Sequence, residues 1–313
     1  MAISPPTTGD PSRLRPWLEL LRLPNVFTAV ADVLAGFLFF HDTLEPWDIC
    51  ALVVCSSVML YLSGMVLNDV MDREVDARQR PERPIPSGRI SLAAASRLGW
   101  SLLIGGVAAA WLASGLVGQL RPGIVATLLA GSIVAYDMVL KKTLAGPIVM
   151  GGCRLLNVLL GMSAATQPWT TAAWMFAGGV GVYVAGVTMF ARTEAARSRR
   201  APLALGAVLM LAGIALVAAF PRWIDDWDLP YLDFADRWPI FWIVISMLIG
   251  LRLARAIADP EPANVQTAVK NAILSIIVID AGACLAMRGP FWATMVVLLM
   301  VPALALGRWI YST

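Results

Sequence analysis

Oxygen-bearing side chains recur every four residues where one long apolar stretch of the chain ends. Asn68, Asp72 and Asp76 stand at i, i+4 and i+8, which puts them on one face of a helix, and Asp69 lies one position away. Amide and carboxylate oxygens are ligands for Mg²⁺, which also keeps water and commonly shares a substrate phosphate. A solvated helix end is the alternative, but carboxylates at a helix C-terminus are unfavourable to the helix dipole. The spacing therefore favours a magnesium site formed by these four residues.

The segment that follows is a short loop rich in arginine and proline, "RPERPIPSG", residues 80–88. Its prolines stiffen the backbone and Gly88 permits a tight turn. Arg80, Arg83 and Arg89 carry planar guanidinium groups that bind phosphate through paired hydrogen bonds. A loop that contacts lipid headgroups would explain the arginines but not the acids before them. Together the two features predict a diphosphate held through a metal at a membrane surface.

These residues need a scaffold, and the composition indicates a membrane-embedded one. Only 14% of the 313 residues are charged and the mean hydropathy is +0.72, whereas soluble proteins carry about 25% charged residues. Several apolar runs reach the ~20 residues that span a bilayer. We predict an all-α integral membrane protein with a single domain over residues 1–313 and a flexible tail over residues 1–15. The candidate spans are 24–41, 48–71, 93–117, 122–140, 146–165, 170–192, 202–220, 238–257, 266–287 and 290–309.

Basic residues are distributed unevenly over the predicted loops. Six arginines lie between residues 73 and 97, and Lys141 and Lys142 fall on the same side, whereas Asp42 and Asp225 fall on the other. Because cytoplasmic loops carry the excess of Lys and Arg, we expect the N-terminus and the acid-rich motif to be cytoplasmic. The net charge of +3 reflects this bias and does not indicate a nucleic-acid partner.

Two segments resemble a known family of membrane enzymes. "NDVMDREVD" followed by "RPERPIPSGRIS" resembles the first aspartate-rich signature, NDxxDxxxD, of the UbiA superfamily of intramembrane prenyltransferases. "YDMVLKKTLAGPIVMGGCRLLNVLLG", residues 136–161, is similar to the segment that crosses that superfamily's fourth and fifth spans. The first helix, "LRLPNVFTAVADVLAG", is similar as well. The resemblance implies a bundle of about nine transmembrane helices around a central cavity, with a tenth helix at the C-terminus left open.

The resemblance also implies a reaction. In this superfamily Mg²⁺ holds the diphosphate of an isoprenoid donor, the diphosphate departs, and a small acceptor, often aromatic, attacks the allylic cation. The chemistry requires charge stabilisation at the leaving group and a pocket that excludes water. The implied partners are an isoprenoid diphosphate, a small hydrophobic or aromatic acceptor, and the bilayer. A non-catalytic protein that binds isoprenoid diphosphate or lipid, or a transporter, is the alternative; the first motif and the arginine loop favour the enzyme.

Roles for individual residues follow from the resemblance. Asn68, Asp72 and Asp76 are the expected metal ligands and catalytic residues, with Asp69 in support. The residues expected to contact the diphosphate are Arg80, Arg83, Tyr136, Lys141, Lys142, Arg154, Asn157, Arg192 and Arg197. Membrane anchoring is the alternative for the two lysines and Tyr136. Charged residues within spans usually face a cavity or a partner, so Arg154 is expected to face the cavity and Asp280 to pair with a basic side chain.

The chain departs from the superfamily where a second acidic motif, DxxxD, is expected. That segment reads "YVAGVTMFARTEAARSRR", and Glu194 is its only acid. Three alternatives follow: Glu194 and water hold a weaker second Mg²⁺, or Arg192 and Arg197 replace the metal with fixed positive charge, or the protein binds the diphosphate without turnover. The sequence thus resembles a divergent branch of the superfamily.

Overall fold

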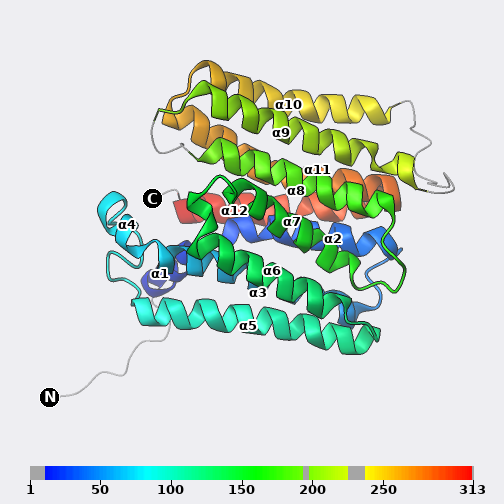
Figure 1. The fold of residues 1–313 in the computed structure, drawn as a ribbon, viewed down its shortest axis with the longest axis horizontal. Helices are drawn as coiled ribbons and strands as arrows, with labels where there is room; N and C mark the ends of the chain where they lie inside the picture. The colour runs from blue at the N-terminus through cyan, green and yellow to red at the C-terminus, as the bar shows by residue number, and fades with distance from the viewer. Residues whose placement is uncertain (1–10, 193–196, 225–236, 312–313) are drawn as a thin grey trace.

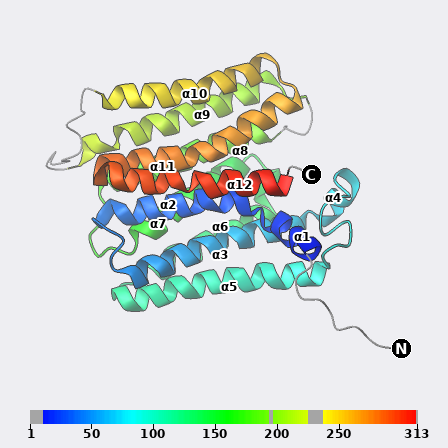
Figure 2. The same cartoon turned by 180° about the vertical axis from the view of Figure 1, so that it is seen from behind.

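The computed structural model describes residues 11–192, 197–224 and 237–311. All regular structure in these residues is helical, and the long helices lie side by side in one bundle (Figures 1 and 2). At one end of the bundle, α1 (Pro11–Leu21) and α4 (Arg73–Gln79) lie together with the end of α12 (Met300–Tyr311). Residues 11–15, expected in a flexible tail, therefore belong to a helix. Residues 1–10 lie outside the described residues.

Six helices form the centre of the bundle and three lie outside them. The central helices pack around a shared interior, with α2 against α3, α7 and α11, and α8 against α7 and α11. The outer helices cover α3, α8 and α11. The central six are α2 (Val26–Phe40), α3 (Trp47–Met71), α6 (Arg121–Met138), α7 (Gly146–Met162), α8 (Thr171–Ala191) and α11 (Pro262–Leu298); the outer three are α5 (Leu92–Val117), α9 (Arg200–Ala219) and α10 (Trp238–Ala258). Short 3-10 turns are η1 (Leu23–Asn25), η2 (Leu140–Lys142) and η3 (Phe220–Trp223).

The helices are long and apolar enough for a multi-pass membrane protein, as the sequence predicted. Among the described residues, seven helical segments meet the length and hydropathy of a membrane span. The count is below the expected nine or ten because Pro262–Arg308 counts as one segment, Gly146–Met162 is short, and α6 is not among the seven. The predicted break between spans 266–287 and 290–309 is confirmed, because Gly289 leaves the helical conformation with φ 80°. The chain is an all-α integral membrane protein.

Two glycines set the contact between α2 and α7. A Cβ atom on Gly36 would collide with the carbonyl oxygen of Val158, and one on Gly161 would collide with that of Val33. The two helices therefore touch backbone to backbone, as small residues permit in membranes. This close approach brings polar side chains on the two helices within hydrogen-bonding reach of each other.

The acid-rich segment continues in helical form past the end of α3. Asp72 lies between α3 and α4, and its N–H donates to the Asn68 carbonyl at 3.0 Å. The N–H of Asp76 donates to the Asp72 carbonyl at 2.8 Å. The loop after α4 turns sharply at Gly88, where φ is 75°, as predicted. The acids thus lie on a near-continuous helix that ends at Gln79, and the arginine loop folds back from there.

Candidate functional site

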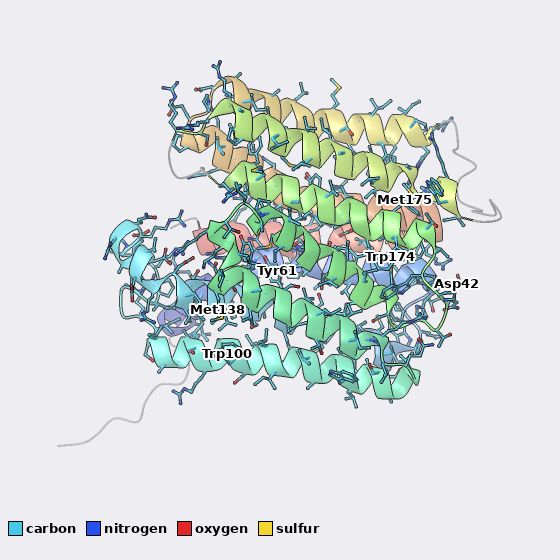
Figure 3. All side chains as sticks on the ribbon, in the orientation of Figure 1. Asp42, Tyr61, Trp100, Met138, Trp174 and Met175 are labelled. Atoms are coloured by element: carbon cyan, nitrogen blue, oxygen red, sulfur yellow. The ribbon has the colours of Figure 1, made fainter. Side chains whose placement is uncertain are left out.

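A cavity of about 380 Å³ lies among the six central helices. Most of its wall is apolar, and polar side chains line it at two levels. Figure 3 shows Tyr61 in the middle of the bundle, Met138 toward the α4 end and Asp42 at the opposite end. The expected central cavity is confirmed. Its apolar lining includes Leu60, Leu129, Ile133, Val184, Ile273 and Ile276, and its polar lining includes Arg22, Ser57, Tyr61, Asn68, Tyr136, Asp137, Arg154 and Asn157.

One ammonium group joins two of the predicted ligands at the mouth of the cavity, the end nearest α4. Lys141 follows α6 in η2, and its side chain is 11% exposed. Its Nζ donates to Asn68 Oδ1 at 3.0 Å and forms an ion pair with Asp72 Oδ2 at 2.8 Å. The two oxygens, one turn apart on the chain, therefore converge on a single cation.

A second group of charges binds the arginine loop to the end of α3. Arg83 Nη1 lies 2.6 Å from Asp76 Oδ2 and 3.3 Å from Asp69 Oδ1. Arg22 Nη2 approaches the same Asp69 oxygen at 3.0 Å. Arg22 lies just before η1 with φ 45°, a left-handed conformation that costs energy in a non-glycine residue. Its position lets it line the cavity as well as contact Asp69.

In the structure the four predicted ligands form two clusters. Asn68 and Asp72 share Lys141, whereas Asp69 and Asp76 share Arg83. Helix geometry gives the reason: residues seven apart are offset by only about 20°, while residues eight apart are offset by about 80°. Within the described ranges, no group of three or more Asp, Glu, His and Cys side chains is gathered closely enough to hold a metal.

The other residues predicted to contact the diphosphate divide into two groups. Tyr136 lines the cavity. Arg192 is exposed, and its Nη2 donates to the Thr143 carbonyl at 2.8 Å, just beyond η2. Arg197 is 72% exposed, pairs with Glu261 at 3.6 Å and is not among the cavity-lining residues. Arg80 and Lys142 are not among the cavity-lining residues. Glu194 lies outside the described residues.

Arg154 and Asn157 line the cavity, as expected for polar residues within a span, and they also form a buried network of hydrogen bonds. Arg154 Nη1 lies 2.7 Å from Asp32 Oδ2, and its guanidinium stacks over the Tyr61 ring at 5.3 Å from the centroid. The Asn157 amide donates to the same Asp32 oxygen at 3.1 Å, and its carbonyl oxygen accepts from Ser57 at 2.7 Å. We call Asp32, Arg154, Asn157 and Asp280 the deep cluster.

Asp280 differs from its expected role. Its side chain is fully buried on α11, and neither carboxyl oxygen has a hydrogen-bond partner among the described residues. The charged group that acts on it most strongly is another acid, Asp32, and Arg154 is the cation nearby. The expected basic partner is therefore shared: one guanidinium faces two carboxyl groups.

Sequence reasoning missed three residues that the structure brings to the cavity or its network. Arg22 and Asp137 line the mouth, and Asp32 anchors Arg154. Asp32 and Asp137 fall inside the predicted spans 24–41 and 122–140. Ionisable residues within spans are expensive and commonly functional, so a signal for both was present in the sequence.

The fold and the site together define a membrane-embedded helical bundle with charged side chains at one end of an apolar cavity. Comparison with known proteins identifies the family. The profile of the UbiA prenyltransferase family matches residues 29–268. The chain belongs to the UbiA prenyltransferase family.

Individual relatives are similar over different lengths. The digeranylgeranylglyceryl phosphate synthase of Methanoculleus marisnigri is 34% identical over 41% of this chain and 43% of its own length. The protoheme IX farnesyltransferase of a Caulobacter species is 26% identical over 81% of this chain and 77% of its own. The chain spans about half the length of the archaeal synthases it matches at 30% identity or more. A UbiA homologue from Archaeoglobus fulgidus, solved with DMAPP and Mg²⁺, shares the fold with a TM-score of 0.61 at 12% identity, over 85% of this chain and 99% of its own.

Proposed function

We propose that this protein transfers a prenyl group from an isoprenoid diphosphate to a small hydrophobic or aromatic acceptor, with Mg²⁺ assisting departure of the diphosphate. The observation that supports this is the cavity, in which basic side chains at the mouth adjoin an apolar wall. Its volume of about 380 Å³ falls in the ~300–1,000 Å³ range of ligand pockets. An isoprenoid diphosphate carries the same two characters, an anionic head and an apolar tail.

The diphosphate binds at the mouth in this proposal. Lys141 and Arg22 line or adjoin the cavity and can donate to phosphate oxygens, with Tyr136 as a further donor. Arg192, at the C-terminal end of α8, adds positive charge near η2. In this proposal it replaces part of the function of the second acidic motif, which this chain lacks. Arg197 is left out because it pairs with Glu261. Arginine forks and ammonium groups of this kind stabilise the charge that accumulates on a leaving diphosphate.

The donor set at the mouth fits Mg²⁺. Asn68 Oδ1 and Asp72 Oδ2 already converge on the Lys141 ammonium, at 3.0 and 2.8 Å, and oxygen donors that gather around a cation are the ligands Mg²⁺ prefers. These two residues would hold the ion together with water and the substrate. When bound, Mg²⁺ neutralises negative charge on the departing diphosphate. Asp69 and Asp76 support the site by holding Arg83 and the loop.

The remaining contribution of the chain is exclusion of water. The apolar wall from Leu60, Leu129 and Ile273 surrounds the prenyl chain, which keeps water from capturing an allylic cation before the acceptor does. The names of the relatives give acceptors as different as a glyceryl phosphate and a haem. We therefore infer the acceptor only from the apolar lining of the cavity, as a small hydrophobic or aromatic molecule that fits there.

The transfer is tested with the full chain in lipid nanodiscs. Labelled farnesyl, geranylgeranyl and longer diphosphates are supplied with Mg²⁺ and a lipid-soluble cell extract as the source of acceptor. We expect diphosphate release that depends on Mg²⁺ and falls by about 100-fold or more in Asp72→Asn. Asp48→Asn, an exposed acid at the other end of α3, is the matched control and should keep full activity. If the chain binds the donors but releases diphosphate from none of them, the result would favour the non-catalytic alternative.

We also propose that the mouth faces the cytoplasm, because the basic loops gather at that end. In a variant without Cys50, Cys55, Cys153 and Cys284, a membrane-impermeant maleimide should label Thr43→Cys from outside intact cells. Ser87→Cys, in the arginine loop, should react only after permeabilisation. The reverse pattern would overturn the orientation.

A further inference from the structure

We propose that Asp137 is the catalytic base of this site, the group that accepts the proton the acceptor loses when it is prenylated. The inference rests on the proposed function and deepens it, because it assigns a residue to the acceptor half of the reaction. Asp137 stands in the last turn of α6, four residues before Lys141, and lines the cavity with 4% of its surface exposed.

One oxygen of the Asp137 carboxylate is buried without a hydrogen-bond partner among the described residues. This oxygen is Oδ2, and no ion pair to Asp137 occurs in the part of the chain that the structure describes. The three other acids of the mouth differ in this respect. Asp72 pairs with Lys141, Asp76 with Arg83, and Asp69 with both Arg22 and Arg83. Burying a polar group without a partner costs free energy, so a structural role alone leaves Asp137 unexplained.

Asp137 also lines the same cavity as groups that are expected to bind the donor, among them Asn68, Arg22 and Tyr136. The charged side chains that act most strongly on Asp137 are Lys141, Asp72 and Arg22, and all three belong to the donor site proposed above. Asp137 is thus adjacent to the place where the diphosphate departs but is not itself bound to the groups that hold the diphosphate. Cys153 on α7 lines the same cavity. An acceptor that attacks from within the cavity passes close to this carboxylate.

The proposed transfer releases a proton that a group in the cavity must accept. The C–O bond of the donor breaks and its electron pair leaves with the diphosphate, while a bond forms between the allylic carbon and the acceptor atom. The acceptor then carries one proton too many, on a hydroxyl oxygen or an aromatic ring carbon. In a pocket that excludes water, that proton needs a base within the cavity. A carboxylate free of ion pairs accepts a proton more readily than one held by arginine or lysine, and Asp137 becomes the neutral acid when it does.

The test separates binding from chemistry in the nanodisc preparation with geranylgeranyl diphosphate as the probe. Asp137→Asn keeps the shape of the side chain and removes the base. We expect the dissociation constant for the donor with Mg²⁺ to change by less than about threefold, while the transfer rate falls by about 10²–10⁴-fold, the usual contribution of a positioned base. Asp137→Ala should lose activity similarly and regain part of it with added formate, whose carboxylate fits the space vacated. Asp48→Asn serves again as the matched control.

Three outcomes would overturn the inference. Unchanged transfer in Asp137→Asn would exclude a base at this position. Donor affinity that falls as much as the rate would place Asp137 in the diphosphate site instead. Loss of activity in Asp137→Ala without rescue by formate would indicate a structural role. Failure of the proposed function itself is distinct, because the wild-type chain would then release no diphosphate from any donor, and the inference would fall with it.

Discussion

The mouth of the cavity and the deep cluster are both rich in charge, but they balance it differently. At the mouth, Asp69, Asp72 and Asp76 each contact a lysine or arginine, and their side chains retain 7–22% exposure. In the deep cluster, Asp32 and Asp280 are fully buried and a single guanidinium, that of Arg154, faces both. These three acids of the mouth are each paired with a cation and partly exposed, whereas the two acids of the deep cluster share one cation and are fully buried.

The difference separates ion pairs that can open to contact a ligand from ion pairs that cannot. An ion pair near water can open and give its cation or its carboxylate to a substrate at modest cost. A buried ion pair has already lost its hydration, so removal of one partner leaves an uncompensated charge. We therefore expect variants at the mouth to change function with little effect on stability. Variants in the deep cluster should do the opposite.

The largest effect is expected from Arg154→Met. Methionine fills much of the same volume but leaves Asp32 and Asp280 without a cation, and breaking a buried pair in this way costs about 3–5 kcal/mol. The free energy of unfolding, measured by SDS titration from detergent micelles, should fall by that amount. Arg154→Lys is the matched control, because it keeps the charge and loses only the planar fork that contacts Asp32 and Thr28. Equal stability of Arg154→Met and wild type would contradict the claim that the deep cluster, unlike the mouth, is needed for stability.

A smaller effect, on binding rather than stability, is expected from Lys141→Met. The ammonium contacts both Asn68 and Asp72 at the mouth, and a hydrogen bond to a charged group contributes about 1.5–3 kcal/mol. The dissociation constant for isoprenoid diphosphate should therefore rise by roughly 10- to 150-fold, while the unfolding free energy changes by less than about 1 kcal/mol.

The neighbouring lysine supplies the control for this measurement. Lys142 is exposed and does not line the cavity, so Lys142→Met should bind the donor as the wild type does. If the two lysine variants lose the same affinity, the lysines act only as general positive charge at the membrane surface.

The contrast also explains what the sequence could predict. The spacing of Asn68, Asp72 and Asp76 along one helix could be read from the sequence because a short motif on one helix fixes its own geometry. The break at Gly289-Pro290 was predictable for the same reason, since proline and glycine act locally. The partition of the acids into two clusters depends on the positions of Lys141 and Arg83. Arg83 is only 7 residues from Asp76 in the sequence, so this contact could be expected from the local sequence. Lys141 is 73 residues from Asn68, and a contact over that separation could not.

The deep cluster was harder to foresee because its members come from three helices. Asp32, Arg154 and Asp280 are separated by more than one hundred residues, and only their placement inside apolar spans marked them. Which charges share a partner follows from the approach of α2 to α7, which Gly36 and Gly161 permit. A single sequence carries no direct record of such contacts, so it could suggest a basic partner for Asp280 but not that Arg154 is shared with Asp32.

The smallest effect, and the one that sharpens the comparison most, is expected from Asp280→Asn. Removal of the second carboxyl leaves the Asp32–Arg154 pair at 2.7 Å intact. The new amide can donate to Asp32 Oδ1, which is buried without a partner, and a net hydrogen bond contributes about 0.5–1.5 kcal/mol. The unfolding free energy should accordingly stay level or rise slightly.

Asp32→Asn is the matched variant for this test, because it removes the carboxylate that Arg154 contacts directly. It should lower the unfolding free energy clearly more than Asp280→Asn does, since the guanidinium loses its ion pair. If the two variants are equally destabilised, the two carboxyl groups are equivalent partners of Arg154. Asp280 would then have a cation as partner, as the paired acids of the mouth do. An acid without its own cation could not then be what distinguishes the two regions.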